Sequence, residues 1–320
     1  MAVYTQVSQQ DLDNFLKNYD IGSLENFNGI SAGVENTNYK IRTNKGFYIL
    51  TLYEKRVDKK DIPFFLELMF YLSNEKIQCP LPIKNRNGKL FGELNSRPAS
   101  ILTFLEGSST ETIYPKQVNT LGKILAKIHI LGKQLKIKRK NPLSLENFES
   151  LITLSKKNSD NIRNDLSKEI DSEYYRVRSN WPGNLPKGII HADLFPDNVL
   201  FIGNEISGVI DFCFSCNDFL SYDLATCLNA WCFDKEGILD LNLSSELING
   251  YQSLRKLEEN EINSFHIICS GSALRFLMTR INDWKDQQGG GVVPKDPMNF
   301  VKILDFHKNV KDAKEYGLTK

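Results

Sequence analysis

Residues 189–198 read IIHADLFPDN, and residues 209–212 read VIDF. In both stretches polar side chains stand directly after a short apolar run. His191, Asp193 and Asn198 follow the first run, and Asp211 follows the second. Acids at the ends of strands either cap turns or take part in chemistry, so the neighbouring sequence has to decide between the two.

The segment between these stretches predicts a β-hairpin. Residues 198–202 and 207–211 are rich in apolar side chains and flank the sequence GNE, which favours a tight turn. A turn centred on the Asn204–Glu205 bond would place Asn198 opposite Asp211, with both side chains on one face. An amide oxygen and a carboxylate side by side suit a hard cation such as Mg²⁺.

These groups match the needs of phosphoryl transfer to a hydroxyl. A metal ion neutralises the phosphates while a separate carboxylate accepts the hydroxyl proton. Asp193 is the predicted general base, and Asn198 and Asp211 are the predicted metal ligands. His191 is predicted to orient the loop. Any one of them could be a turn residue, but the four together favour catalysis.

The whole chain bounds the class of protein. Its 320 residues exceed a typical domain of about 100–150 residues, which predicts two lobes. A hydrophobic fraction of 41% and a charged fraction of 25% are typical of a globular protein. The formal charge of +1 offers no electrostatic surface for nucleic acid or an anionic membrane. Without an apolar span or a leader pattern, we expect a cytoplasmic protein with no membrane and no nucleic-acid partner.

The six cysteines are scattered, which favours reduced thiols. Cys213 and Cys216, followed by Cys227 and Cys232, have the spacing of zinc ligands. Their neighbours read as strand and helix rather than as polar knuckles. Buried small hydrophobic side chains are therefore the favoured interpretation.

The order of elements predicts an α+β fold. Alternating apolar runs at 39–42 and 47–53, and a strand at 99–105, predict an antiparallel sheet with one helix over 61–74. Helical periodicity follows over 116–133, 159–178, 222–234, 244–258, 260–285 and 297–315. We expect residues 1–105 to form one lobe, and residues 106–320 to form a larger, mainly helical lobe.

The two opening stretches carry a family resemblance. HADLFPDN resembles the catalytic loop of kinases, and VIDFCFS resembles their metal-binding Asp-Phe segment, with Cys213 in place of the usual Gly. The His-x-Asp form, ahead of a long helical region, is similar to the aminoglycoside phosphotransferase and choline kinase-like superfamily. GVENTNYKIRTNKGFYILTLYEKR, GVIDFCFSCNDFLSYDLA and ALRFLMTRINDW extend the resemblance to the bacterial homoserine kinases of that superfamily.

This resemblance implies a bilobal protein-kinase-like fold, in which residues 1–105 form the nucleotide-binding lobe and residues 106–320 form the catalytic and substrate-binding lobe. It also implies ATP and L-homoserine as substrates, Mg²⁺ as cofactor, and a step in threonine biosynthesis. Thr51 stands where many relatives have a phosphate-pairing Lys, and the main chain at Thr103 and Leu105 would bind adenine. The predicted nucleotide-binding residues are Gly33, Asn36, Thr37, Asn38, Thr51, Thr103 and Leu105.

Homoserine brings a carboxylate and an ammonium group, so its recognition needs a cation together with acids or amides. Arg275 and Arg280 are the predicted partners of the carboxylate. Asn217 and Asp218 are the predicted partners of the ammonium group, while Asp193 would meet the hydroxyl. Intramolecular ion pairing is an open alternative for both arginines.

Other readings remain. The same reaction could act on choline or ethanolamine, on methylthioribose or on an aminoglycoside, and Tyr222, Trp231 and Trp284 could supply an aromatic cage for choline. A nucleotide-binding pseudokinase, acting as a regulator, is the alternative that is not an enzyme. Thr51 favours it, and the presence of Asp193, Asn198 and Asp211 disfavours it. The chain could act as a monomer or as a homodimer.

Overall fold

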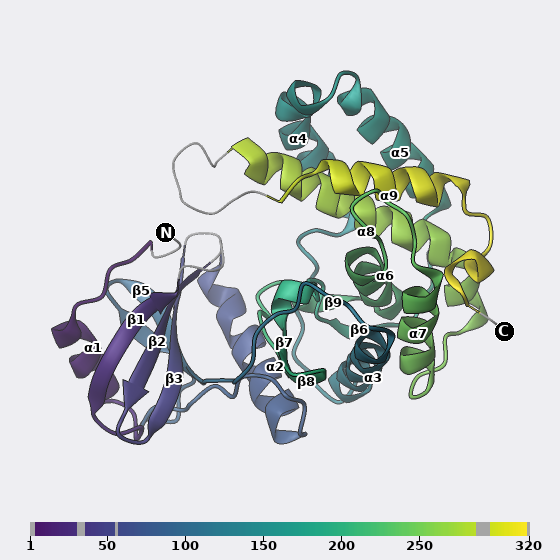
Figure 1. Cartoon of the computed structure of the whole chain (residues 1–320). Coiled ribbons are helices and arrows are strands. Elements are labelled where there is room, and N and C mark those ends of the chain that lie inside the picture. Colours follow the sequence, from purple (N-terminus) through teal and green to yellow (C-terminus); the bar gives the residue numbers. More distant parts are fainter. Residues whose placement is uncertain (1–3, 31–35, 55–56, 286–294, 319–320) are drawn as a thin grey trace. The chain divides into compact units, whose positions relative to one another are not determined.

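The computed structural model describes residues 4–30, 36–54, 57–285 and 295–318. These residues form two compact units. The first contains the described part of residues 1–107 together with residues 207–213. The second contains residues 108–206, residues 214–285 and the described residues from 295 onward. The predicted α+β class is confirmed, with an antiparallel sheet in the N-terminal part and helices in the C-terminal part (Figure 1).

The first unit is built on a five-stranded sheet in the order β1-β2-β3-β5-β4, with antiparallel neighbours. Its strands are β1 (Leu24–Ile30), β2 (Asn36–Thr43), β3 (Gly46–Tyr53), β4 (Gly92–Leu94) and β5 (Arg97–Thr103). Its helices are α1 (Gln9–Leu16), the 3₁₀ turn η1 (Lys59–Asp61) and α2 (Ile62–Asn74). Pro63 near the start of α2 suits a position where no helical N–H bond is needed.

Helix α1 covers one part of this sheet. It begins with a capping box, in which Ser8 and Asp11 satisfy each other's backbone N–H groups. Its apolar residues Leu12 and Phe15 share a buried cluster with strand residues such as Ile41. The sequence did not predict this helix, because eight residues are too few to show a clear helical period.

The second unit holds the remaining helices and three short strands. Its helices are α3 (Pro115–Gly132), α4 (Phe148–Ile162), α5 (Leu166–Asn180), α6 (Leu220–Trp231), α7 (Leu241–Gln252), α8 (Glu259–Lys285) and α9 (Met298–Asn309). Its 3₁₀ turns are η2 (Leu145–Asn147), η3 (Pro196–Asn198) and η4 (Ala313–Tyr316). Its strands are β6 (Lys187–Ile190), β7 (Val199–Ile202) and β9 (Cys216–Phe219); β6 pairs with β9.

Helix α8 is the central element of the second unit. It contacts α4, α5, α6 and α9 (Figure 1). Leu274, Leu277 and Ile281 lie in a buried cluster with Phe300 and Leu304 of α9. Because several neighbours cover α8, its apolar residues do not keep to a single face, as expected for a buried helix.

Helices α3 and α7 approach each other closely because each carries a glycine at the contact. A Cβ atom at Gly122 would lie 2.3 Å from the Leu247 carbonyl oxygen. A Cβ atom at Gly250 would lie 2.0 Å from the Asn119 carbonyl oxygen. Both distances are shorter than any real carbon–oxygen contact, so this packing requires glycine at both positions.

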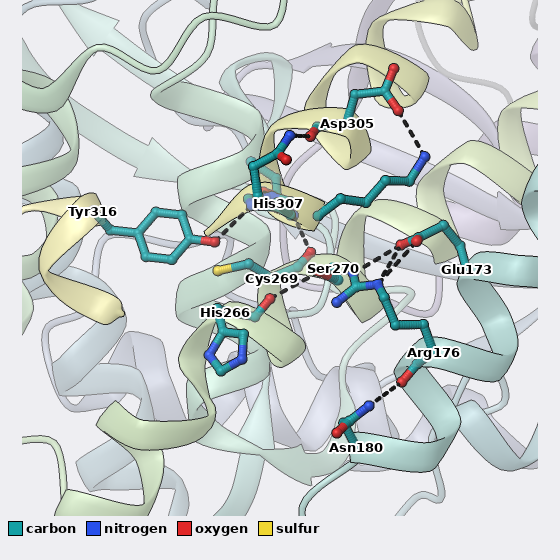
Figure 2. Close-up of polar contacts among 12 residues, drawn as sticks. Glu173, Arg176, Asn180, His266, Cys269, Ser270, Asp305, His307 and Tyr316 are labelled. Atoms are coloured by element: carbon teal, nitrogen blue, oxygen red, sulfur yellow. Dashed lines mark hydrogen bonds and ion pairs between the residues drawn. The ribbon is translucent and has the colours of Figure 1, made fainter. Parts of the chain in front are cut away.

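A buried polar network ties the C-terminal turn η4 to the helices. His307 of α9 contacts Tyr316 through Nδ1, at 2.7 Å from the hydroxyl (Figure 2). Its Nε2 atom lies 2.8 Å from Oδ1 of Asn229. Nearby, Arg176 of α5 donates to Glu173 and to the Ser270 hydroxyl of α8 (Figure 2). Burial lowers the pKa of His307 to about 3, so its ring is neutral at physiological pH.

The hairpin after the catalytic loop differs from its predicted register. Strand β7 ends at Ile202 and its partner β8 (Glu205–Val209) begins two residues after Gly203, so the loop is Gly203–Asn204. Gly203 adopts a φ of +59°, which lets the turn form one residue earlier than expected. Asn198 lies in η3 and Asp211 follows β8, so the predicted cross-strand pairing of the two is wrong.

Two further properties of the described chain bear on its class. None of its helices is both long enough and apolar enough to cross a bilayer. None of the six cysteines, all of which lie in the described residues, forms a disulfide, and five of them are buried. In the same residues no group of three or more His, Cys, Asp or Glu side chains is arranged to hold a metal ion.

Candidate active site

The catalytic loop predicted from the sequence follows strand β6 in the second unit. His191 is 1% exposed, and Ala192 adopts a left-handed backbone with a φ of 64°. For a non-glycine residue this conformation costs of the order of 1–3 kcal/mol, and it persists only where the surrounding structure enforces it. The loop is therefore held in place from outside.

Asp223, at the start of α6, provides this support. Its carboxylate accepts the main-chain N–H groups of His191 at 2.7 Å and Ala192 at 2.8 Å. Its Oδ2 atom lies 3.1 Å from Nε2 of His129. Burial acts to raise the pKa of Asp223, but the hydrogen bonds and charge of His129 and His191 outweigh it and lower the pKa. An ionised carboxylate thus fixes the strained peptide.

The support extends away from the loop through a buried chain of contacts. His129 Nδ1 lies 2.7 Å from the Tyr251 hydroxyl, and Arg255 donates to the same hydroxyl at 3.0 Å. Arg255 also pairs with Glu261 at 2.9 Å. The sequence offers no signal that Asp223 and His129 are partners, because they lie 94 residues apart in the chain.

Asp193 and Asn198 lie together on the loop. The Asn198 amide nitrogen is 2.8 Å from the Asp193 carbonyl oxygen and 3.1 Å from Asp193 Oδ2. Both partners are acceptors, so they fix which end of the amide is nitrogen. The Asn198 oxygen is consequently turned away from Asp193, as a ligand for a hard cation requires.

Arg275 of α8 lies beside Asp193. Its Nη1 atom is 3.7 Å from Asp193 Oδ1, and its side chain is only 4% exposed. The guanidinium group lies 3.8 Å from the Phe276 ring centroid and 5.2 Å from that of Phe214. The structure therefore brings one of the two predicted arginines next to the predicted base.

Arg280 is engaged elsewhere. It donates to the Asp296 carbonyl oxygen at 3.0 Å, and its guanidinium lies 4.4 Å from the Phe300 ring centroid. Burial lowers the pKa of Arg280 to about 10. Lys295, in the same segment, forms a 2.6 Å ion pair with Asp197 of the catalytic loop. These contacts show Arg280 holding the start of α9 in place.

Asn217 and Asp218, the predicted ammonium partners, lie on β9. The Asn217 side-chain oxygen accepts the Arg139 main-chain N–H at 2.8 Å. Asp218 accepts the Asn141 amide at 2.7 Å and the Phe219 main-chain N–H at 2.8 Å. Burial raises the pKa of Asp218 above the usual range. Both side chains thus have internal partners.

Three of the predicted nucleotide-binding residues, Asn36, Thr37 and Asn38, lie at the start of β2 in the first unit. Thr37 is fully buried, and its hydroxyl donates to Glu54 at 2.7 Å. The Thr51 hydroxyl of β3 donates to Asn38 Oδ1 at 2.8 Å. Asn36 donates to the Cys213 sulfur at 3.2 Å. Gly33 lies outside the described residues.

The predicted adenine-binding segment ends β5. The Thr103 main-chain N–H donates to the Leu81 carbonyl oxygen at 3.0 Å, and its hydroxyl accepts the Leu81 N–H at 2.9 Å. A Cβ atom at Gly208 would lie 2.6 Å from Leu105 Cδ1, so the glycine allows β8 to pack against Leu105. The segment is therefore fixed on both sides.

Asp211 follows β8 in the first unit and adopts a φ of 61°. Its Oδ1 atom accepts the Cys213 main-chain N–H at 3.4 Å, a long and weak bond. Of the non-glycine residues with positive φ in the described chain, Ala192 and Asp211 belong to the two stretches singled out by sequence. Strain of this kind concentrates at functional sites.

The aromatic residues considered for a choline cage do not share a surface. Trp231 is 1% exposed, and its indole N–H donates to the Leu194 carbonyl oxygen at 2.8 Å. Trp284 is 42% exposed. Trp231 supports the catalytic loop from within and has no face to offer a quaternary ammonium group.

Comparison with known proteins identifies the family. Residues 26–257 match the model of the phosphotransferase enzyme family. The homoserine kinase of Agrobacterium fabrum (strain C58) is 46% identical over 319 residues, covering 99% of each chain. The homoserine kinase of Rhizobium etli is 46% identical over 320 residues, covering 100% of each chain.

Solved structures show the same fold. An amicoumacin kinase in complex with AMP-PNP, Ca²⁺ and Ami aligns with a TM-score of 0.68 and 16% identity, over 95% of this chain and 92% of that one. A choline kinase from Cryptosporidium parvum aligns with a TM-score of 0.67 and 16% identity, over 96% of each chain. The kinase-like fold predicted from the catalytic loop is thereby confirmed, and the chain belongs to the homoserine kinases of the phosphotransferase enzyme family.

Proposed function

We propose that the chain transfers the γ-phosphoryl group of ATP to the side-chain hydroxyl of L-homoserine, giving O-phospho-L-homoserine for threonine biosynthesis. The observation that carries the proposal is the position of Asp193 on a strained, rigidly held loop, 3.7 Å from the buried cation of Arg275. A base and a cation so placed suit a substrate that carries both a hydroxyl and a carboxylate. The sequence identity of 46% to homoserine kinases, over essentially the full length of the chain, supports this substrate.

Asp193 is the proposed general base. Its carboxylate is partly exposed, so it can reach a substrate hydroxyl and accept its proton as the oxygen attacks the phosphorus. Asn198 contacts one carboxylate oxygen of Asp193 and Arg275 lies near the other, so the carboxylate has little freedom to rotate. His191, buried beneath the loop, is proposed to orient it rather than to exchange protons.

Asn198 and Asp211 are the proposed Mg²⁺ ligands. The orientation of the Asn198 amide, with its nitrogen bonded to Asp193, fits this role, as does the weakly engaged carboxylate of Asp211. When bound, Mg²⁺ would neutralise phosphate charge. We expect Asp211→Ala to weaken the affinity for ATP in the presence of Mg²⁺. Equal affinities of the variant and wild type in a calorimetric titration would reject the metal role.

The proposed nucleotide contacts are Gly33, Asn36, Thr37, Asn38, Thr51, Thr103 and Leu105. Thr51, which stands where many relatives have a Lys, donates a hydrogen bond to Asn38. This position therefore carries a neutral hydrogen-bonding group in place of a cation. Thr37 is proposed to act through its main chain, because its hydroxyl is bonded to Glu54. The substrate site is proposed to be shaped by the segments at Asp296, Arg139 and Asn141, which are held in place by Arg280, Asn217 and Asp218 respectively.

A coupled assay of ADP release tests the proposal. The purified chain is given Mg²⁺-ATP with L-homoserine, choline, methylthioribose or kanamycin in turn. We expect turnover on L-homoserine well above the ATPase background, and a lower kcat/KM on the other acceptors. Homoserine-dependent turnover no greater than background would refute the proposed function.

A further inference from the structure

A small crevice in the second unit lies against the catalytic loop. It is lined by residues 141–143 together with Ala192, Phe214, Tyr222 and Arg275. It holds about 220 Å³ of empty space, part of which is open solvent. As it stands the crevice is too narrow for a water molecule, so a ligand would have to part its side chains to enter.

Two donor groups that line this crevice are unsatisfied. Tyr222 and Arg275 are each 4% exposed. Within the described residues, neither the Tyr222 hydroxyl nor Arg275 Nη1 has a hydrogen-bond partner. A buried donor without a partner has lost its hydration and gained no bond, so native proteins retain few such groups. Burial raises the pKa of Tyr222, which keeps its hydroxyl protonated and able to donate.

The guanidinium of Arg275 forms a long ion pair with Asp193, but its Nη1 atom has no hydrogen-bond partner among the described residues. Phe276 and Phe214 lie near it, with ring centroids at 3.8 Å and 5.2 Å. The 3.7 Å separation from Asp193 Oδ1 is too long for a hydrogen bond. A buried, positioned guanidinium with an unfilled donor is suited to a planar anion such as a carboxylate.

We infer that Arg275 and Tyr222 together bind the carboxylate of the acceptor, and that this pair makes the enzyme select hydroxyl amino acids over amino alcohols. The inference rests on the proposed function. It assigns Tyr222 a role in binding the substrate carboxylate and gives a physical reason for the choice of acceptor. In homoserine only three carbons separate the hydroxyl from the carboxyl carbon. A hydroxyl at Asp193 therefore leaves the carboxylate close to the neighbouring Arg275, where Tyr222 can donate a second bond.

The first test measures stability. Tyr222→Phe removes a buried hydroxyl that has no partner, so we expect its melting temperature to equal or exceed that of the wild type. Tyr316→Phe is the matched control, because its buried hydroxyl is bonded to His307 at 2.7 Å and its loss should lower the melting temperature. A fall for Tyr222→Phe as large as that of the control would assign its hydroxyl to structure and overturn the inference.

The second test measures selectivity with L-homoserine and 3-aminopropan-1-ol, which keeps the hydroxyl and the amine but lacks the carboxylate. Tyr222→Phe should lower kcat/KM for L-homoserine by about 10- to 100-fold, the value of a hydrogen bond to a charged group, and leave the amino alcohol unaffected. Arg275→Lys should act in the same direction, since a Lys cannot bind a carboxylate bidentately. Tyr175→Phe, at a side chain 65% exposed, is the surface control.

Equal losses on both acceptors would mean that the pair only positions Asp193, which would overturn the inference. Absence of homoserine turnover in the wild type would instead refute the proposed function. In that case, calorimetric titration of the wild type with both compounds still tests the crevice. Binding of L-homoserine no tighter than binding of 3-aminopropan-1-ol would overturn the inference by itself.

Discussion

Ala192 shows at the scale of one residue how the fold serves the site. Its positive φ turns the chain so that Asp193 leaves the buried strand and becomes partly exposed. The two N–H groups that this turn would leave unpaired both donate to Asp223. The strain and its compensation lie in different segments, so the sequence of the loop alone could not reveal them.

The role of Asp193 leads to a prediction at this scale. Asp193→Asn keeps the shape of the side chain but cannot accept a proton, so turnover should fall by about 10²- to 10⁴-fold. ATP binding should be retained. Asp197→Asn, four residues further along the same loop, loses only an exposed ion pair with Lys295, worth at most about 1 kcal/mol.

Steady-state kinetics and nucleotide titration of the two variants check this prediction. Near-normal turnover by Asp193→Asn would show that another group takes the hydroxyl proton. A comparable loss in both variants would show that the loop, and not the Asp193 carboxylate, is the sensitive feature.

At the scale of elements, the contact between α3 and α7 depends on its glycines. Gly250→Ala would place a methyl group 2.0 Å from the Asn119 carbonyl oxygen. Since neither backbone can yield without moving a helix, we expect a loss of about 1–3 kcal/mol in the free energy of unfolding. Gly183→Ala is the matched control, because its added Cβ would have no neighbour within 4 Å.

Urea titration of both glycine variants measures the difference. A midpoint for Gly250→Ala equal to that of Gly183→Ala would mean that the helices can separate at little cost. Because α3 carries His129 and α7 carries Tyr251, a real separation should also lower turnover by loosening the support of Asp223.

The His307 network gives a pH dependence at the same scale. The pKa of His307 falls on folding from the ordinary value of 6.5 to about 3. Below pH 6.5 the unfolded chain therefore binds a proton that the folded chain does not. The stability that the neutral ring provides is complete above pH 6.5 and is lost as the pH falls toward 3, at up to about 1.4 kcal/mol per pH unit.

Urea midpoints at several pH values between 7 and 4 check this effect in the wild type and in His307→Gln. The variant should be less stable at pH 7, because Tyr316 and Asn229 lose their partner. It should also lose less stability on acidification than the wild type. Parallel pH profiles of the two proteins would contradict the proposed role of His307.

For the molecule as a whole, the sequence predicted what local patterns encode. The sheet, most helices and the kinase-like loops follow from periodicity and short motifs. It missed most of α4 and merged the end of that helix with α5 in one predicted helix over 159–178. It also placed the hairpin turn one residue late, because Gly203 rather than Asn204 opens the turn. It also could not tell Arg275 from Arg280, since both lie on α8 and only tertiary packing places one beside Asp193 and the other beside Asp296.

The central claim is that this chain phosphorylates the hydroxyl of L-homoserine. It is tested most directly by identifying the product by phosphorus NMR after incubation of the purified chain with Mg²⁺-ATP and L-homoserine. We predict a phosphomonoester signal of O-phospho-L-homoserine that grows in step with ADP and is absent from Asp193→Asn. Formation of ADP with inorganic phosphate alone, or of no ADP beyond the background without homoserine, would contradict the claim.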